Sequence, residues 1–172
     1  MRIDLGGIAK GYAADEALRA MAGLGIRSAL IDAGGDIVCS DAPPNKKAWI
    51  VAVGQKNSKS PTTNERTLIQ LNNAAVATSG DQFQFVEIEG KRYSHIVDPK
   101  TGMGLTQRRN VTVVAKDGMS ADGLASAISV MGKSGFELLP KYSAAALIVE
   151  IDPKVTIASP GFDAHKFELP TK

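Results

Sequence analysis

"QFQFVEIEGKRYSHIVD", residues 82–98, decides the fold class that this sequence predicts. Polar and apolar residues alternate on both sides of Glu89-Gly90, which is the pattern of a β-hairpin with one face in water. Strands joined by so short a turn run antiparallel. The stretch therefore favours a sheet with antiparallel pairing at this point in the chain.

Outside the hairpin, other stretches have the three- and four-residue periodicity of amphipathic helices. The first covers residues 9–24, is rich in alanine and stops at Gly25, and the second covers residues 118–132. A short helix is also expected over residues 135–142, broken by its proline. These helices do not alternate regularly with strands, which argues against a parallel α/β fold.

The remaining apolar stretches predict further strands. Between them, residues 54–66 are expected to form a polar loop, and the tail from residue 159 to be irregular. We therefore predict an α+β fold in which mixed or antiparallel β-sheet hairpins pack against helices. No repeat or domain boundary is visible, so we expect residues 1–172 to form one domain. The strand-like stretches are 28–33, 48–53, 110–116 and 144–151, with two more inside 66–80 on either side of Asn72-Asn73.

The composition argues against several classes of function. Aromatic residues make up 5% of the chain and the net charge is +2, so a surface for nucleic acid is not expected. The single cysteine, Cys39, rules out an internal disulfide and a multi-cysteine zinc site. No apolar run reaches the length that a membrane span needs.

Two glycine-containing turns gather charged residues in the N-terminal part. The first, Asp4-Leu5-Gly6-Gly7, leads into the predicted helix, whose N-terminal N–H groups and dipole suit an anion such as phosphate. A plain helix-capping turn is the alternative, and the turn alone favours it. The second, "DAGGD" at 32–36, sets two carboxylates around a glycine pair.

Two further corners combine hydroxyl groups with carboxylates. "TSGDQF", residues 78–83, places Ser79 and Asp81 around Gly80. Asp122 and Ser126 are four residues apart and so project from one face of the predicted helix. A carboxylate and a hydroxyl at this spacing can hold a hard cation such as Mg²⁺. A capping aspartate beside a packed serine explains the pair equally well.

His95 comes just before Asp98-Pro99, where the proline should end the strand. If Tyr93, His95 and Val97 share one strand face, His95 and Tyr93 point the same way. Imidazole titrates near neutral pH and is a suitable general base. The alternative is a structural histidine satisfied by the carboxylate of the turn.

The four motifs together resemble one known family. In this order and spacing, "DLGGIAKGYAAD", "DAGGDI", "VATSGDQF…GKRYSHIVDPKTG" and "VTVVAKDGMSADGLASAISVMG" are similar to the ApbE family of flavin transferases, from residue 3 to about residue 132. The resemblance implies a T-fold-like arrangement and a reaction that uses FAD and Mg²⁺. A threonine hydroxyl of an acceptor protein attacks the FMN phosphate of FAD, and AMP leaves. The family usually has a longer N-terminal half that helps to bind the flavin.

The resemblance also assigns roles to residues. It implies metal ligands at the Asp122 and Ser126 side chains and the Gly7 carbonyl, and a catalytic base at His95. Most relatives have threonine at the position of Ser126, alanine at that of Gly7 and often asparagine at that of Asp36. The implied cofactor-binding residues are Asp4, Gly6, Gly7, Lys10, Ser79, Asp81 and His95.

Three functions remain open from the sequence. The first is transfer of FMN to a protein threonine, the second is Mg²⁺-dependent hydrolysis of FAD to FMN and AMP, and the third is a non-catalytic flavin-binding remnant. The resemblance implies an acceptor of the kind found in redox membrane complexes. It also implies a place on the periplasmic side of the cell envelope if the full-length protein carries an export signal, and the cytoplasm otherwise.

Overall fold

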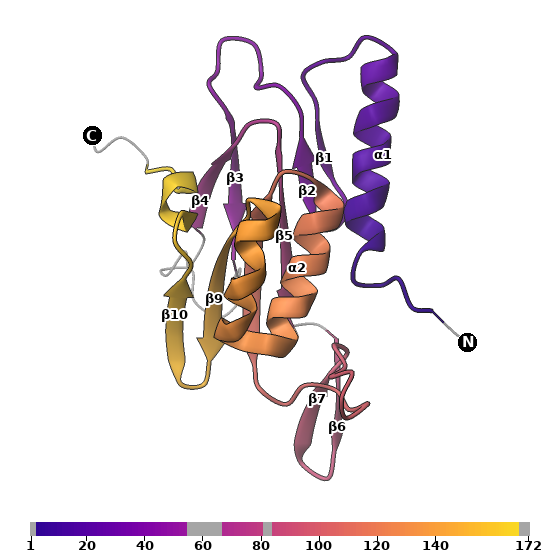
Figure 1. Ribbon diagram of the computed structural model, residues 1–172, viewed down its shortest axis with the longest axis vertical. Helices are drawn as coiled ribbons and strands as arrows, with labels where there is room; N and C mark the ends of the chain where they lie inside the picture. The colour runs from indigo at the N-terminus through magenta and orange to yellow at the C-terminus, as the bar shows by residue number, and fades with distance from the viewer. Residues whose placement is uncertain (1–2, 55–66, 81–83, 169–172) are drawn as a thin grey trace.

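The computed structural model of the chain describes residues 3–54, 67–80 and 84–168. Its centre is a six-stranded sheet in the order β1-β2-β5-β8-β9-β10, and every neighbouring pair is antiparallel (Figure 1). The predicted α+β class with antiparallel pairing is therefore confirmed. The strands are β1 Leu30–Asp32, β2 Ile37–Cys39, β5 Ala74–Gly80, β8 Arg109–Ala115, β9 Ala145–Ile151 and β10 Lys154–Ala158.

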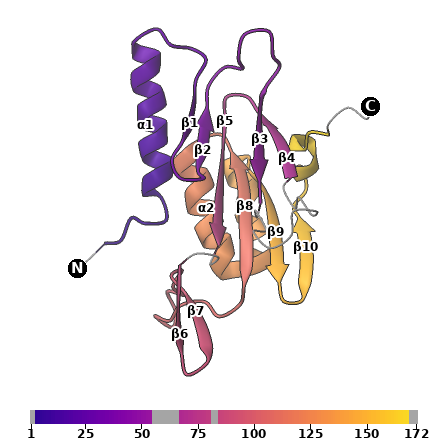
Figure 2. The same cartoon turned by 180° about the vertical axis from the view of Figure 1, so that it is seen from behind.

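Each face of this sheet packs against a different layer. Figures 1 and 2 show helices on one face and a second, two-stranded sheet on the other. The helical layer contains α1 Ala9–Gly23, α2 Gly118–Met131 and the 3₁₀ helix η1 Gly132–Tyr142. The opposite layer contains β3 Trp49–Val53, β4 Thr67–Leu71 and the short helix η2 Phe162–His165.

Alternation along β5 and β8 explains why both layers are possible. Ala77 and Val113 point into the cluster beneath the helices, whereas Val76 and Val114 point into the cluster beneath β3 and β4. All seven residues of β8 are buried, because its strand lies between two neighbours and between two layers. The centre of the sheet is thus packed on both faces, and the residues at the ends of its strands are anchored to this core.

The beginnings of α1 and α2 cap one another. Asp15 of α1 accepts hydrogen bonds from the Gly118 and Met119 N–H groups at 2.7 and 2.9 Å. Asp122 of α2 accepts one from the Gly11 N–H of α1 at 3.2 Å. A Cβ on Gly11 would lie 2.1 Å from the Gly118 carbonyl oxygen, so glycine is required where the two backbones touch. This reciprocal contact fixes the N-terminus of α1 against α2.

The hairpin at 82–98 is present but smaller than predicted. β6 Phe85–Ile88 and β7 Lys91–Ser94 turn at Glu89-Gly90, both with positive φ, and project beyond the main sheet (Figure 1). All four residues of β6 are exposed, so the expectation of a single wet face is wrong. The reason is that neither face of this two-stranded ribbon lies over the core.

Other differences from the prediction concern short or irregular elements. β2 and β10 were not predicted, and Pro140 lies inside η1 instead of breaking it. The φ angle that the proline ring imposes lies within the range of a 3₁₀ helix, so the helix continues through Pro140. The Asn72-Asn73 turn is confirmed, but the strands that it joins belong to different sheets. Within the described residues, no helix has the length and apolar character that a membrane span requires.

Candidate functional site

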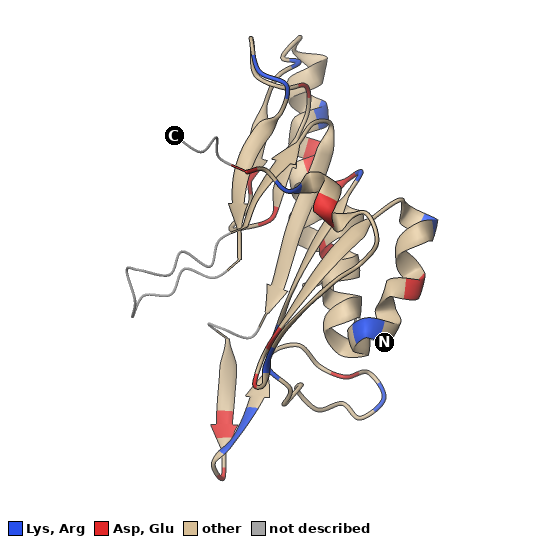
Figure 3. Ribbon diagram, turned by 90° about the vertical axis from the view of Figure 1, so that its left-hand side faces the viewer, with Lys and Arg blue, Asp and Glu red and all other residues tan. Residues whose placement is uncertain are grey.

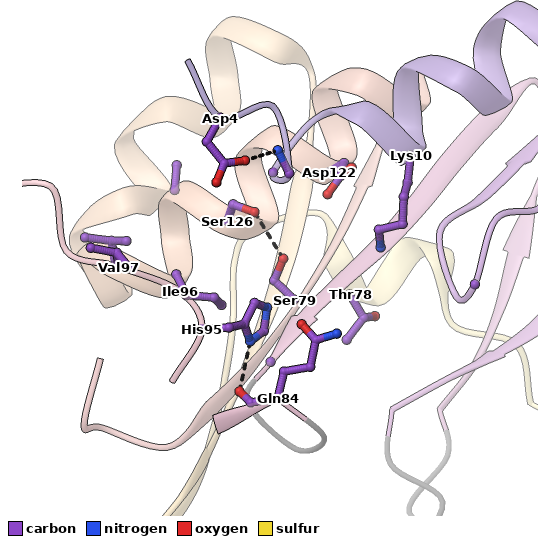
Figure 4. Close-up of a pocket in the computed structure, with 16 residues that line it drawn as sticks. Asp4, Lys10, Thr78, Ser79, Gln84, His95, Ile96, Val97, Asp122 and Ser126 are labelled. Atoms are coloured by element: carbon purple, nitrogen blue, oxygen red, sulfur yellow. Dashed lines mark hydrogen bonds between the residues drawn. The ribbon is translucent and has the colours of Figure 1, made fainter. Parts of the chain in front are cut away.

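A cavity of about 770 Å³ lies where the N-terminus of α1, the middle of α2, the end of β5 and the base of the hairpin meet (Figure 4). Sites for small molecules are commonly of this size. The structure brings nearly all the residues predicted for binding and catalysis to its walls. These are Asp4, Gly6, Gly7, Lys10, Ser79, His95, Asp122 and Ser126. Asp81 was also predicted but lies outside the described residues.

The Asp4–Gly7 turn forms the entrance to α1. Asp4 Oδ1 accepts a hydrogen bond from the Gly6 N–H at 2.7 Å, which closes the turn before the helix begins at Ala9. The N-cap residue of α1 is Ile8, whose side chain makes no hydrogen bond to the first turn of the helix. Gly7 and Lys10, at this end of α1, line the cavity, so the positive end of the helix dipole borders it.

Asp122 is held at this helix end from the neighbouring helix. It is 3% exposed, and burial, followed by the negative charge of Asp36, raises the pKa of its carboxyl above the ordinary aspartate value. The Gly11 N–H and the positive charge of Lys10 act in the opposite direction. In a regular helix the Gly11 N–H would donate to the carbonyl of Gly7, and its bond to Asp122 leaves that carbonyl without this partner.

Ser126 and Gly7 lie in contact beside Asp122. The Ser126 Oγ is 3.3 Å from the Ser79 Oγ, and a Cβ on Gly7 would lie 3.0 Å from the Ser126 Oγ. The three residues implied as metal ligands therefore converge. No group of three or more His, Cys, Asp or Glu side chains in the described residues could hold a metal. A cation here would depend on one carboxylate, a hydroxyl and a carbonyl, which suits a hard ion.

His95 lies after the end of β7, so the prediction that it shares a strand face with Tyr93 is wrong. Its Nδ1 is 3.0 Å from the Gln84 carbonyl oxygen (Figure 4). A carbonyl only accepts, so Nδ1 carries the hydrogen and Nε2 of the neutral ring keeps its lone pair. Asp98 instead accepts from the Lys100 N–H at 2.8 Å, so the alternative of a histidine satisfied by the turn carboxylate is also wrong.

The sequence did not single out several residues that line the cavity. Thr78 and Gly80 were within the quoted corner around Ser79, and Gln84 was within the hairpin stretch, but none had a chemical signal of its own. The ion pair between Lys10 Nζ and Asp36 Oδ2, at 2.6 Å, was also not predicted. It joins residues from α1 and the β1–β2 turn, which only the folded chain brings together.

Known proteins are similar to this chain in both sequence and fold. The profile of the ApbE family matches residues 1–148. The FAD:protein FMN transferase of Haemophilus influenzae is 33% identical over 152 residues, covering 86% of this chain and 43% of that protein. That of Vibrio cholerae is 36% identical over 135 residues, covering 76% and 39%.

Solved structures give the same result. The ApbE protein of Thermotoga maritima superposes with a TM-score of 0.84 at 34% identity, over 97% of this chain and 54% of that one. The flavin transferase ApbE of Vibrio cholerae superposes with a TM-score of 0.79 at 30% identity, over 95% and 52%. The chain thus spans about half the length of these relatives. Because the family profile and these structures agree over nearly all of its residues, the chain belongs to the ApbE family.

Proposed function

We propose that this chain carries the phosphate-transfer site of an FAD:protein FMN transferase. FMN would pass from FAD to a threonine hydroxyl of an acceptor protein, and AMP would be released. One observation carries the proposal: a helix N-terminus, a buried carboxylate and an imidazole whose Nε2 has no partner among the described residues border the same cavity. The names of the curated relatives support FAD as the donor and a protein as the acceptor.

The charges around the cavity favour a divalent cation, which we take to be Mg²⁺. Asp4 and Asp122 line the cavity. Among the described residues, Lys10 is the only lysine or arginine on its wall. The pyrophosphate of FAD would therefore meet a site with little positive charge of its own. In this proposal Asp122, Ser126 and the Gly7 carbonyl would hold Mg²⁺, which would neutralise the phosphates and stabilise the charge that develops during transfer.

The protein's own groups have separate roles in the proposed reaction. The Ala9 and Gly11 N–H groups already donate to the Leu5 carbonyl and to Asp122, so the positive end of the α1 dipole and the Lys10 ammonium would orient the phosphates. The threonine oxygen forms a bond to the FMN phosphorus while the bond from that phosphorus to the bridging oxygen breaks. AMP leaves with that oxygen and its electron pair. His95 Nε2 accepts the proton of the attacking hydroxyl.

Hydrolysis of FAD is the second candidate, because His95 is exposed and water could take the place of the threonine. The two reactions give different products. We expect the 172-residue chain, FAD and Mg²⁺ to yield AMP only when an acceptor is present. Chromatography of the nucleotides would show this. AMP and free FMN without acceptor would identify a hydrolase, and FAD that stays intact in every mixture would indicate a non-catalytic binding protein.

The acceptor and the location are further parts of the proposal. We expect the acceptor to be a subunit of a redox membrane complex, as the resemblance to flavin transferases implies. If the full-length protein carries an export signal, the reaction would take place on the periplasmic side of the cell envelope, and otherwise in the cytoplasm. The active chain and FAD would be added to an envelope fraction and to a cytosolic fraction. The fraction in which a protein becomes covalently fluorescent would show which compartment holds the acceptor.

A further inference from the structure

The Lys10–Asp36 ion pair distinguishes this site from one with a free lysine. Lys10 points into the cavity from the first turns of α1 (Figure 4), and its side chain is 49% exposed. Asp36 lies behind it, with a side chain that is only 3% exposed, and does not itself line the cavity. The lysine is thus the solvent-facing half of a pair whose other half is buried.

The surroundings of Asp36 make this pair persistent. The β1–β2 turn is closed by the Ala33 N–H, which donates to the Asp36 carbonyl at 2.8 Å, and by Gly34 and Gly35, both with positive φ. Within the described residues, Asp36 Oδ2 has no hydrogen-bond partner, and its counterion is the Lys10 ammonium 2.6 Å away. A buried carboxylate that loses its counterion is strongly unfavourable. Lys10 is therefore held by Asp36 when no other cation is near.

An anion at this site competes with Asp36 for the same ammonium. With Asp36 paired to Lys10, the two side chains contribute no net charge, and Asp4 and Asp122 remain on the cavity wall. The other charged residues are interspersed by sign along the described chain (Figure 3), so they give no strong positive field to compensate. Phosphate groups would therefore meet a site whose lysine is already neutralised.

We propose that Asp36 sequesters Lys10 and so weakens the binding of the FAD pyrophosphate when no divalent cation is present. This inference rests on the proposed function, because it concerns the same donor and the same cavity. Asp36 is a positioning residue that acts through Lys10 and sets how strongly phosphate binding depends on a cation.

Equilibrium dialysis with FAD in EDTA tests the proposal. Asp36→Asn keeps the shape of the side chain and removes the charge, so it should tighten FAD binding about tenfold or more. The gain should shrink as NaCl is raised from about 0.05 to 0.5 M. Asp36→Asn combined with Lys10→Met should show no gain. Asp32→Asn removes a charge from the same hairpin without touching Lys10, and should bind FAD as the parent does.

Each result decides the proposal. Equal affinity of the parent and the Asp36→Asn variant in EDTA, including no binding by either, would overturn it. So would a gain that persists in the double variant, or an equal gain in Asp32→Asn. Melting curves verify that each variant is folded. A separate dialysis of the parent with Mg²⁺ tests the proposed function. If Mg²⁺ leaves the FAD affinity of the parent unchanged while Asp36→Asn binds FAD more tightly in EDTA, only the role of the metal is contradicted.

Discussion

His95 has one ring nitrogen bonded to the Gln84 carbonyl and one, Nε2, with no partner in the part of the chain that the structure describes. Nδ1 bonds to the Gln84 carbonyl, which an asparagine amide at this position could also do. We expect His95→Asn to keep the fold and FAD affinity but to lower turnover about 10²–10⁴-fold, because the amide cannot accept a proton. If a folded His95→Asn protein released AMP at the parental rate, His95 would not be the base, and its role would be structural.

At Asp122, burial and the charge of Asp36 raise the carboxyl pKa above its ordinary value. Between the ordinary and the raised pKa, the folded state binds more protons than the unfolded state. The free energy of unfolding therefore falls as the pH rises through this window, which begins at about pH 4. Asp122→Asn should remove this part of the slope. Denaturant unfolding of both proteins from about pH 4 to 8 would measure it, and identical slopes would contradict the assignment.

Ser126 provides a test of the proposed cation site at the level of one oxygen. Ser126→Thr keeps the hydroxyl that meets Ser79, whereas Ser126→Val has nearly the shape of threonine without it. We expect the valine variant to need more Mg²⁺ than the threonine variant for half-maximal FAD binding. Superimposable Mg²⁺ titrations for the two variants would show that the hydroxyl has no such role.

At the scale of elements, the contact between α1 and α2 positions the site. A methyl group on Gly11 would meet the Gly118 carbonyl at 2.1 Å, so we expect Gly11→Ala to lower the free energy of unfolding by about 1–3 kcal/mol or more. Gly23, in the last turn of the same helix, has nothing within 4 Å of an added Cβ. Gly23→Ala should therefore raise stability by up to about 1 kcal/mol. Urea denaturation that ranks the variants the other way would contradict this contact.

The sequence predicted the elements that have strong local patterns. The helix over 118–132 and the turn at Glu89-Gly90 were correct because periodicity and turn residues act over a few neighbours. β2 was missed because three residues are too few to show alternation. The position of His95 beyond β7 could not be predicted. β7 ends at Ser94, where its pairing with β6 ends, and not at the residue before Pro99.

At the scale of the molecule, the site depends on residues that are far apart in the chain. The resemblance predicted most of the cavity wall because it assigned roles motif by motif, and the fold then brought these motifs together. It did not predict the Lys10–Asp36 pair or the capping of α1 by Asp122, which are tertiary contacts. The fold and the family are therefore readable from the sequence, whereas the electrostatics of the site require the structure.

The intact mass of an acceptor protein tests the central claim most directly. The 172-residue chain would be incubated with FAD, Mg²⁺ and a threonine-bearing acceptor of a related flavin transferase. We predict that the acceptor gains the mass of one FMN molecule minus one water, with an equal amount of AMP released. An acceptor with valine in place of the target threonine should gain no mass. An unchanged acceptor mass, with FAD either intact or hydrolysed to free FMN, would contradict the assignment of this cavity to FMN transfer.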